Sequence, residues 1–473
     1  MISELLCDSN ESLLVAMKII NQNAKGICFI VSNNGTLIGV LTDGDIRRGI
    51  LSGTELQDPV SKIVASNFVY GLQHDDIDFL MSKLNNKVSI IPLIDKDKQV
   101  VDYFEYSQST HFPVASPTLN GNEFKYLTDA FFSSWISSSG IYLDKFEHEF
   151  SKYSDCSFGV AVSNGTVALH LALVTLGIGD GDEVIIPDLT FAATINAVLH
   201  ANATPVIVDI EKDSWCISPS EIERAITEKT KAIIPVHLYG QPCNMDLIMG
   251  ISTRYNLKVI EDCAEAHGAM FRGKKVGSFG DIGCFSFYGN KVITTGEGGM
   301  CVTNNSSLDE KMRLLRDHGM SKTKRYWHDH VGFNYRLTNI QAAIGLAQLE
   351  RIDDIHHNRR KYENAYKEVL GSQYSFQSDL PDRSRITWLV AILVNKSLDR
   401  EDLMERFTSM GIDVRPFFYP LSEMDIYKKF SNLKTPISKE VSKIGLNLPT
   451  YESLKSIKQI KEIVSDIVVL PSS

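Results

Sequence analysis

From residue 158 onward, short apolar runs alternate with segments in which apolar residues recur every three or four positions. The short runs predict buried strands, and the longer periodic segments between them predict helices. Strands are expected at 158–162, 183–186, 204–208, 231–236, 258–260 and 282–287. Helices are expected at 167–176, 193–200, 218–227 and 246–255. This alternation predicts an α/β fold with a mostly parallel, doubly wound sheet covered by helices on both faces.

The first hundred or so residues carry a different pattern, in which pairs of short apolar strands are joined by tight polar turns. These strands are expected at 26–31, 36–41, 88–93 and 99–104. Each pair predicts a β-hairpin. After the first hairpin, Thr42 and Asp45 stand three residues apart at an expected helix start. That spacing fits a capped helix with an acidic first turn, and local stability alone would explain it.

The segment GVLTDGDIRRGI at residues 39–50 resembles a CBS module, a small α+β domain that packs in tandem and often binds adenine nucleotides. The resemblance implies a regulatory pair of such modules over residues 1–112, with Thr42 and Asp45 at a ribose and phosphate site. The second unit departs from the pattern, because residues 101–105 offer no Ser/Thr-x-x-Asp. One nucleotide site is expected at most, and a purely structural module stays an open alternative.

Residues 111–117 separate this module from the rest, because two prolines within five residues exclude a helix. From residue 122 apolar side chains return at helical spacing, which predicts an amphipathic helix. A later, long helical pattern leads into a basic run at 356–361, which favours a solvated helix face. We expect a large domain over 113–355 and a smaller C-terminal α/β domain over 356–473.

Composition excludes several classes of function. The chain has 473 residues, a net charge of -10 and 43% apolar residues, which is typical of a globular protein and argues against nucleic-acid binding. The first residues, MISELLCDSNESLL, lack the features of a secretion signal, and no window resembles a membrane span. Eight cysteines occur without a CxxC pair, which favours reduced thiols over disulfides or a zinc site. We therefore expect a cytoplasmic protein without a metal.

Ligands of such sheets bind beyond the carboxyl ends of the strands, so residues that follow each strand are candidates for function. After the strand at 158–162, Ser163-Asn164-Gly165-Thr166 opens a helix with small and hydroxyl residues, which suits a phosphate. The same residues also fit an ordinary helix cap. After the strand at 183–186, Phe191 would stack on a flat cofactor or belong to the core.

Two further strand ends carry charged residues. Asp262 follows the strand at 258–260, where a buried carboxylate needs a cationic partner such as a protonated pyridine nitrogen. Lys291 follows the strand at 282–287 and precedes a glycine-rich turn at 296–299. A lysine that is held by backbone while its amine reaches a ligand suits a Schiff base. A capping aspartate and a surface lysine on a turn are the ordinary alternatives.

Six ordered segments resemble the sugar aminotransferases of the DegT/DnrJ/EryC1/StrS family, within fold type I of the pyridoxal phosphate enzymes. The segments are SNGTVALHLAL, IEDCAEAHGA, FSFYGNKVITTGEGGM, KRYWHD, GFNYRLTNIQAAIG and RPFFYPL. The resemblance covers residues 113–473 and implies pyridoxal 5'-phosphate as cofactor, L-glutamate as amino donor and an obligate homodimer. Related 3-dehydratases replace the lysine by histidine. This chain keeps Lys291, so amino transfer is implied.

The resemblance also assigns roles to the matched positions. Lys291 would hold the cofactor as a Schiff base, Asp262 would pair with its pyridine nitrogen, and Phe191 would stack on its ring. Glu265 takes a position near the cofactor where the family uses Gln, His or Glu. The residues implied at the phosphate are Gly165, Thr166, Ser286 and, for the cofactor of the neighbouring subunit, Asn334. The cationic candidates for the substrate's diphosphate are Lys322, Lys324, Arg325, His328, Arg336 and Arg415.

Four segments, EDCAEA, GNKxITTGEGGM, RYWHD and RPFFYP, favour within the family the 4-aminotransferases that act on GDP-4-keto-6-deoxymannose for surface polysaccharide synthesis. A UDP- or dTDP-linked 3- or 4-keto sugar stays open, because the nucleotide pocket is formed by loops. A nucleotide-sensing regulator whose aminotransferase lobe only binds cofactor is a further alternative. Such regulators usually carry a basic DNA-binding helix pair, which the first hundred residues do not show.

Overall fold

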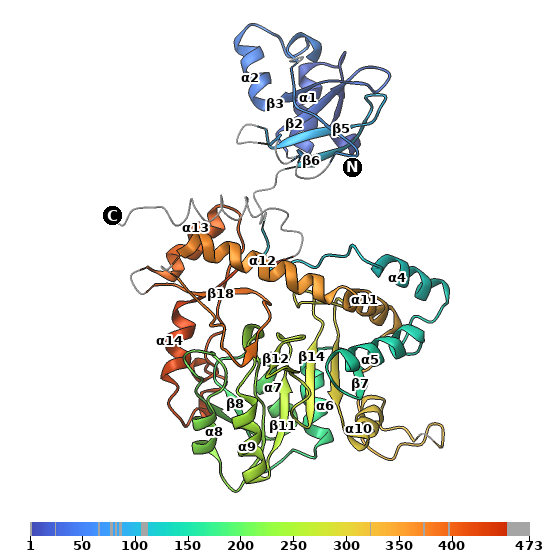
Figure 1. The fold of residues 1–473 in the computed structure, drawn as a ribbon. Helices are drawn as coiled ribbons and strands as arrows, with labels where there is room; N and C mark the ends of the chain where they lie inside the picture. Colours follow the sequence, from blue (N-terminus) through green and yellow to red (C-terminus); the bar gives the residue numbers. More distant parts are fainter. Residues whose placement is uncertain are drawn as a thin grey trace. The chain divides into compact units, whose positions relative to one another are not determined.

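The computed structural model describes residues 2–23, 25–64, 67–75, 79–80, 83–84, 88–105, 112–321, 323–371, 374–395 and 398–451. The chain forms two compact units, Met1–His111 and Phe112–Ser473 (Figure 1). Within the described ranges, no helix combines the length and the apolar character that a membrane crossing needs.

The first unit contains two three-stranded sheets, each built around a hairpin. One sheet has the order β1 (Leu6–Asp8), β2 (Ile27–Val31), β3 (Leu37–Thr42). The other has the order β4 (Gly71–Leu72), β5 (Ile90–Ile94), β6 (Val100–Glu105). Helices α1 (Leu13–Asn23) and α2 (Asp43–Leu51) pack on the first sheet through apolar side chains. The four strands expected from the sequence lie within two residues of the observed ones at each end.

The second unit is built on a seven-stranded sheet with the order β7-β15-β14-β11-β10-β8-β9. In chain order the strands are β7 (Phe158–Val162), β8 (Glu183–Pro187), β9 (Thr204–Val208), β10 (Thr230–Ile233), β11 (Lys258–Asp262), β14 (Ile282–Ser286) and β15 (Gly299–Thr303). The pairs from β14 to β9 are parallel. Strand β15 lies antiparallel between β14 and β7. The predicted mostly parallel sheet is confirmed, and β15 is the strand that the sequence did not indicate.

Helices cover both faces of this sheet, because successive side chains of a strand point to opposite sides. One core joins the sheet to α6 (Gly165–Thr175), α7 (Ala193–His200) and α10 (Ser306–Arg316). The opposite face packs against α5 (Ile141–Tyr153), α8 (Pro219–Ala225), α9 (Met245–Tyr255) and α11 (Asn339–Leu349). On β11, Ile260 belongs to the first core and Val259 to the second. This confirms the doubly wound arrangement.

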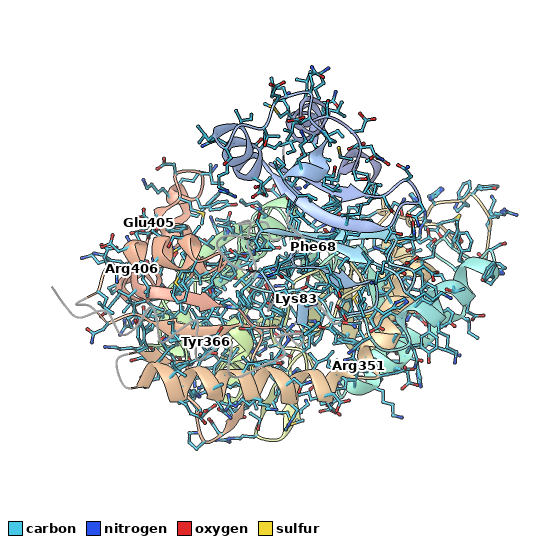
Figure 2. The ribbon with its side chains drawn as sticks, turned by 90° about the horizontal axis from the view of Figure 1, so that it is seen from above. Phe68, Lys83, Arg351, Tyr366, Glu405 and Arg406 are labelled. Atoms are coloured by element: carbon cyan, nitrogen blue, oxygen red, sulfur yellow. The ribbon has the colours of Figure 1, made fainter. Side chains whose placement is uncertain are left out.

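The long helical pattern after residue 334 forms two helices, α11 and α12 (Ile352–Leu370), with Arg351 between them. Figure 2 shows Arg351 beside the start of α12 and Tyr366 farther along the same helix. The basic run at 356–361 was expected to face solvent. His357 and Lys361 are exposed, but Arg359 keeps only 3% of its surface accessible. The expectation is therefore wrong for Arg359, whose guanidinium donates to backbone carbonyls.

A smaller sheet follows α12, with the order β16 (Ser375–Phe376), β18 (Val390–Leu393), β20 (Gly445–Leu448), β19 (Arg415–Pro416). Helices α13 (Arg400–Ser409) and α14 (Pro436–Ile444) accompany this small lobe. A further small sheet pairs β13 (Lys274–Lys275), β12 (Met270–Phe271) and β17 (Arg383–Ser384). The border between large and small domains at 355/356 stays a prediction.

The predicted amphipathic helix after residue 122 is α4 (Glu123–Phe132). Its buried side includes Glu123 and Ala130. Its three phenylalanines are exposed, with Phe124 at 81% and Phe132 at 79%, whereas Tyr126 packs against the core. The helix therefore covers the core with one side, while its phenylalanines lie on a second, exposed apolar side.

Candidate active site

A cavity of about 890 Å³ opens where the parallel strands of the large sheet end. Its wall combines residues that follow β7, β8, β11 and β14 with residues of the small lobe. The predicted site residues that line it are Gly165, Thr166, Phe191, Asp262, Glu265, Ser286, Lys291 and Arg415. The cavity thus lies at the carboxyl edge of the sheet, where the strand pattern predicted that a ligand would bind.

One end of the cavity suits an anion. Gly165 begins α6, and the side chain of Asn164 caps this helix by accepting a hydrogen bond from Val167 N at 3.0 Å. A Cβ on Gly165 would lie 2.8 Å from Cβ of Ser286, so only glycine lets the helix start approach the end of β14 this closely. Unpaired N–H groups at a helix start, together with the Thr166 and Ser286 hydroxyls, suit a phosphate.

His267 supports the phosphate end from behind, although the sequence reasoning gave it no role. Its Nε2 lies 2.9 Å from the carbonyl oxygen of Ser286 and donates to it. Burial lowers the pKa of His267 to about 3, so the ring is neutral and carries its proton on Nε2. The neutral ring fixes the strand end without bringing a charge to the cavity.

Asp262 is the last residue of β11 and is buried. One carboxylate oxygen accepts from the Thr194 hydroxyl at 2.9 Å, and the other accepts from Ala264 N at 3.2 Å. Burial raises the pKa of Asp262, while the bonds from Thr194 and Ala264 and the charge of Lys291 oppose this shift. A buried carboxylate with these few donors is stabilised by a cation, and a pyridinium nitrogen supplies one.

The amine of Lys291 lies between a carboxylate and an aromatic ring. Its Nζ is 3.6 Å from Oε1 of Glu265 and 4.0 Å from the ring centroid of Trp388. The other oxygen of Glu265 accepts from Tyr239 N at 2.9 Å. Burial raises the pKa of Glu265 to about 7, and the charge of Lys291 limits the shift. Glu265 can therefore gain or lose a proton near neutral pH beside the lysine.

An aromatic side chain borders the space between these groups. Phe191 lies between β8 and α7 and is 59% exposed in this chain. Its ring centroid is 5.7 Å from that of Phe418 in the small lobe. The face of Phe191 is thus available to a flat ring held between Asp262 and Lys291.

Three of the predicted residues, Asn334, Arg336 and His328, lie in one segment of the described structure and do not line this cavity. Asn334 is exposed, and Arg336 forms an ion pair with Asp317. His328 bonds through Nδ1 to the carbonyl oxygen of His318 at 2.9 Å. The structure therefore does not bring these side chains to the lysine of their own chain.

The remaining cationic candidates are scattered. Arg415 lines the cavity and lies 3.7 Å from Asp413. Lys324 and Arg325 lie over the rings of the exposed Trp327 and Tyr326. Lys322 lies outside the described residues.

Thr42 and Asp45 form a complete capping box at the start of α2. Asp45 N donates to the Thr42 hydroxyl at 3.2 Å, and Thr42 N donates to Asp45 Oδ2 at 3.0 Å. Asp45 also pairs with Arg48 at 2.5 Å. These bonds provide the local stability that the sequence allowed for, and the nucleotide site stays a prediction.

Several residues that touch the lysine or its partners were not indicated by the sequence. Thr194 lies in the first turn of α7, four residues after Thr190, and their hydroxyls are 3.0 Å apart. Trp388 reaches the lysine segment from 98 residues beyond Asn290. The Thr-x-x-x-Thr spacing could have suggested the contact between Thr190 and Thr194. No local pattern indicates the contact between Trp388 and the lysine segment.

Comparison with known proteins agrees with this geometry. Residues 117–468 match the DegT/DnrJ/EryC1/StrS aminotransferase family, and residues 1–52 match the CBS domain. The GDP-perosamine synthase of Escherichia coli O157:H7 is 45% identical over 362 residues, which cover 75% of this chain and 99% of that protein. The GDP-perosamine synthase of Caulobacter vibrioides is 46% identical over 346 residues, covering 72% and 93%.

Among solved structures, the aminotransferase from Psychrobacter cryohalolentis is similar, with a TM-score of 0.69 and 31% identity over 74% of this chain and 98% of that one. The chain belongs to the DegT/DnrJ/EryC1/StrS aminotransferase family. It is a pyridoxal phosphate-dependent sugar aminotransferase with a CBS domain at its N-terminus, which confirms the predicted family, fold, enzyme class and cofactor.

The residues of the cavity fit this cofactor on three separate observations. The close approach of Gly165 to Ser286 leaves room for a phosphate at a helix start. Asp262 is a buried carboxylate that a ring cation would stabilise. Lys291 directs its amine into the same space.

Proposed function

We propose that this chain is a GDP-perosamine synthase, which moves the amino group of L-glutamate to C4 of GDP-4-keto-6-deoxymannose and releases 2-oxoglutarate. Its product would serve surface polysaccharide (O-antigen) synthesis. One observation carries the chemical part: a single cavity holds the Lys291 amine, the buried Asp262 carboxylate and the Gly165–Ser286 cradle. The names of the two relatives support the choice of sugar and base.

We assign the cofactor contacts to the residues that surround this cavity. Bound pyridoxal phosphate supplies an electron sink while its ring nitrogen stays protonated. Asp262 would hold that proton in place, because its buried carboxylate favours a cation nearby. Phe191 would cover one face of the ring. The phosphate would be bound by Thr166, Ser286 and the backbone at Gly165.

The proton transfers would be carried out by Lys291, with Glu265 beside it. The lysine amine lies in the cavity, from which it can take a proton from a carbon atom and return it. Glu265 lies 3.6 Å away and has a pKa of about 7, because burial disfavours its charge. It would therefore accept or supply a proton as the charge of the lysine changes.

The substrate's charged groups need cations near the cavity mouth. Among the described arginines, Arg415 lines the cavity and can bind a carboxylate or a phosphate there. His328 and Arg336 lie elsewhere in the chain, and we assign them to the diphosphate bound at the neighbouring subunit. Asn334 lies in the same segment and would reach that subunit's cofactor phosphate.

A homodimer follows from these assignments, and the exposed face of α4 offers a surface for it. We define the α4 surface as the exposed apolar side chains on and just after this helix, Phe124, Phe131, Phe132, Trp135 and Ile136. Exposed apolar patches of this kind mark interfaces. A second copy of this chain is the occupant that also explains why Asn334 lies away from the cavity of its own chain.

We further propose that the N-terminal unit binds a nucleotide at Thr42 and Asp45 and tunes activity. The match to the CBS domain supports this role. Calorimetry on the full chain with adenine and guanine nucleotides tests it, with Asp45→Asn as the variant expected to weaken binding. Heat of binding that is unchanged in this variant, or absent from the wild type, would argue for a structural module.

The compartment that we propose is the cytoplasm. All eight cysteines are unpaired and buried. Such thiols are typical of a reducing compartment.

The decisive assay for the sugar uses purified protein, pyridoxal phosphate, L-glutamate and keto sugars linked to GDP, UDP or dTDP. We expect kcat/KM for GDP-4-keto-6-deoxymannose to exceed kcat/KM for the UDP- and dTDP-linked sugars by at least about tenfold. Hydrogen-bonding groups of the pocket that pair with guanine would have no partner on another base. Lys291→Ala should reduce kcat by about a thousandfold. Amination of only a UDP- or dTDP-linked sugar would refute the GDP assignment, and no turnover with any sugar would favour a regulator.

A further inference from the structure

The backbone around Lys291 is held from outside the large sheet. Lys291 belongs to no helix or strand, and its N–H bonds within a turn to Tyr288 O at 2.9 Å. The carbonyl of Asn290 accepts from Nε1 of Trp388 at 2.8 Å. The carbonyl of Lys291 itself accepts from Arg359 at 3.4 Å. These two long-range bonds fix the two peptide groups that flank the Cα atom of Lys291.

The indole of Trp388 also meets the lysine's amine. Nζ of Lys291 lies 4.0 Å from the ring centroid, and Oε1 of Glu265 lies 3.6 Å from the same nitrogen. An ammonium is attracted to the face of an aromatic ring, and indole is the best of these rings. Trp388 therefore contacts the amine of Lys291 with its ring face and the carbonyl of the preceding residue, Asn290, with its N–H.

Tyr239 fixes both neighbours of the amine. Its ring stacks on Trp388 with centroids 6.0 Å apart and planes at 17°, and its N–H donates to Glu265. Tyr239 is buried and has a φ of 52°, a left-handed conformation that is unfavourable for a residue with a side chain. Strain of this kind persists where surrounding contacts enforce it, and it is concentrated at functional sites.

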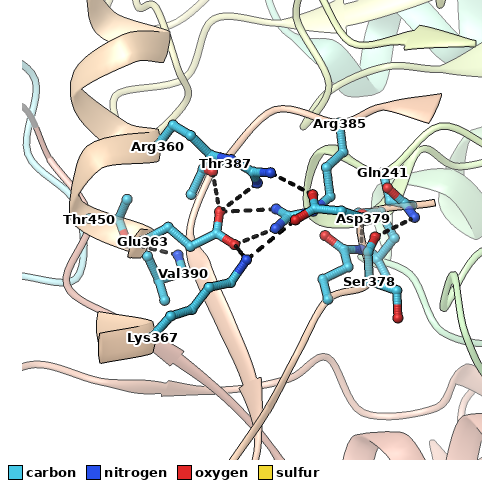
Figure 3. Close-up of polar contacts among 12 residues, drawn as sticks. Gln241, Arg360, Glu363, Lys367, Ser378, Asp379, Arg385, Thr387, Val390 and Thr450 are labelled. Atoms are coloured by element: carbon cyan, nitrogen blue, oxygen red, sulfur yellow. Dashed lines mark hydrogen bonds and ion pairs between the residues drawn. The ribbon is translucent and has the colours of Figure 1, made fainter. Parts of the chain in front are cut away.

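The segment that carries Trp388 is fastened to one face of α12. Arg359 donates to the carbonyl of Trp388 at 2.5 Å. Glu363, four residues along the helix, accepts from Arg385 and Thr387 just before Trp388 (Figure 3). Burial opposes the charge of Glu363, yet the bonds from Arg385 and Thr387 hold its pKa at about 2. The ionised carboxylate thus anchors the segment at neutral pH.

We propose that Trp388 is a positioning residue for Lys291. Its indole face receives the lysine amine whenever that amine is not bonded to the cofactor, and its N–H fixes the peptide that carries the lysine. The amine then returns to one place between successive amino transfers. The inference rests on the aminotransferase function and adds to it a residue from the small lobe, which acts through the lysine.

The test distinguishes a change in the position of the lysine amine from a change in the shape of the cavity. Cofactor-free protein is mixed with pyridoxal phosphate, and the rate at which the absorption of the lysine-bound cofactor appears is measured. In parallel, the Kd for pyridoxamine phosphate is measured, because this form carries an amine and makes no bond to lysine. We expect Trp388→Leu to slow the capture by about tenfold, because neither the amine nor the Asn290–Lys291 peptide is then held in one position. Its Kd for pyridoxamine phosphate should stay within about twofold of wild type.

Two further variants complete the design. Trp388→Phe keeps an aromatic face and should recover most of the capture rate. Trp215→Leu is the matched control, because Trp215 is also buried but packs on Phe417. If Trp388→Leu does not fold, Trp388→Met takes its place, since Met fills irregular gaps in a core.

The outcomes distinguish this inference from the function on which it rests. Capture by Trp388→Leu at the wild-type rate, or an equal loss of pyridoxamine phosphate binding, would overturn the positioning role. Failure of the wild-type chain to capture pyridoxal phosphate at all would instead overturn the assignment of Lys291.

Discussion

Glu265 shows how burial tunes a single residue of this site. Its pKa rises from 4.5 to about 7 because burial disfavours the carboxylate, although Lys291 lies 3.6 Å away. The folded chain therefore binds the proton more tightly than the unfolded chain does. Between pH 4.5 and about 7 the folded state holds more protons, so this group's contribution to stability decreases as the pH rises.

This decrease of stability with rising pH gives a prediction for Glu265→Gln in the cofactor-free protein. Between pH 5 and pH 8, the unfolding free energy of the wild type should decrease by up to about 3 kcal/mol more than that of the variant. Urea unfolding at both pH values measures the difference, because the two chains share every other titrating group. Equal pH dependence in both chains would show that Glu265 is ionised throughout this range.

At the scale of elements, α4 departs most from the behaviour of a core helix. Tyr126 packs against the core beside Tyr142, but Phe124, Phe131 and Phe132 are exposed. The α4 surface is the interface we assign to the second copy, which would bring Asn334 of one chain to the cofactor of the other.

We predict that Phe131→Ser combined with Phe132→Ser converts the dimer to a monomer and lowers kcat together with it. Each exposed aromatic side chain that a partner covers contributes about 1.5–3 kcal/mol of transfer free energy. Sedimentation velocity measures the mass, and Lys125→Ser is the control on an exposed polar position of the same helix. A monomeric wild type, or an unchanged mass in the double variant, would contradict the assignment.

The helix α12 illustrates what sequence patterns leave out at this scale. A run of basic residues predicts a solvated face, yet Arg359 is buried where its guanidinium bonds to the carbonyls of Lys291 and Trp388. Guanidinium groups can be buried when carbonyl oxygens satisfy them, and the local sequence does not show where those carbonyls lie.

At the scale of the whole molecule, the strand pattern predicted the edge of the sheet at which the cavity opens, because this information is local. Asp262 and Ser286 end their strands, and Gly165 begins the helix after β7, so short segments place each of them. Strand β15 was not indicated, because it begins at the last glycine of the glycine-rich turn. Its antiparallel place between β14 and β7 depends on long-range pairing.

The contacts of the small lobe could not be predicted for the same reason. Trp388 meets the Lys291 amine and stacks on Tyr239 only after the two lobes pack together. Arg415 was indicated by the family motif, and the cavity lining supports its proximity to the site. His328, Arg336 and Asn334 lie away from the cavity of their own chain, so their roles depend on the proposed second copy.

The central claim is that Lys291 is the residue that binds pyridoxal phosphate, and peptide mass spectrometry after borohydride reduction tests it most directly. Reduction makes a Schiff base between lysine and cofactor permanent. We expect the reduced cofactor on the peptide that contains Lys291, and its loss from that peptide when excess L-glutamate is added before reduction. The cofactor on another lysine, or on Lys291 regardless of glutamate, would contradict the account.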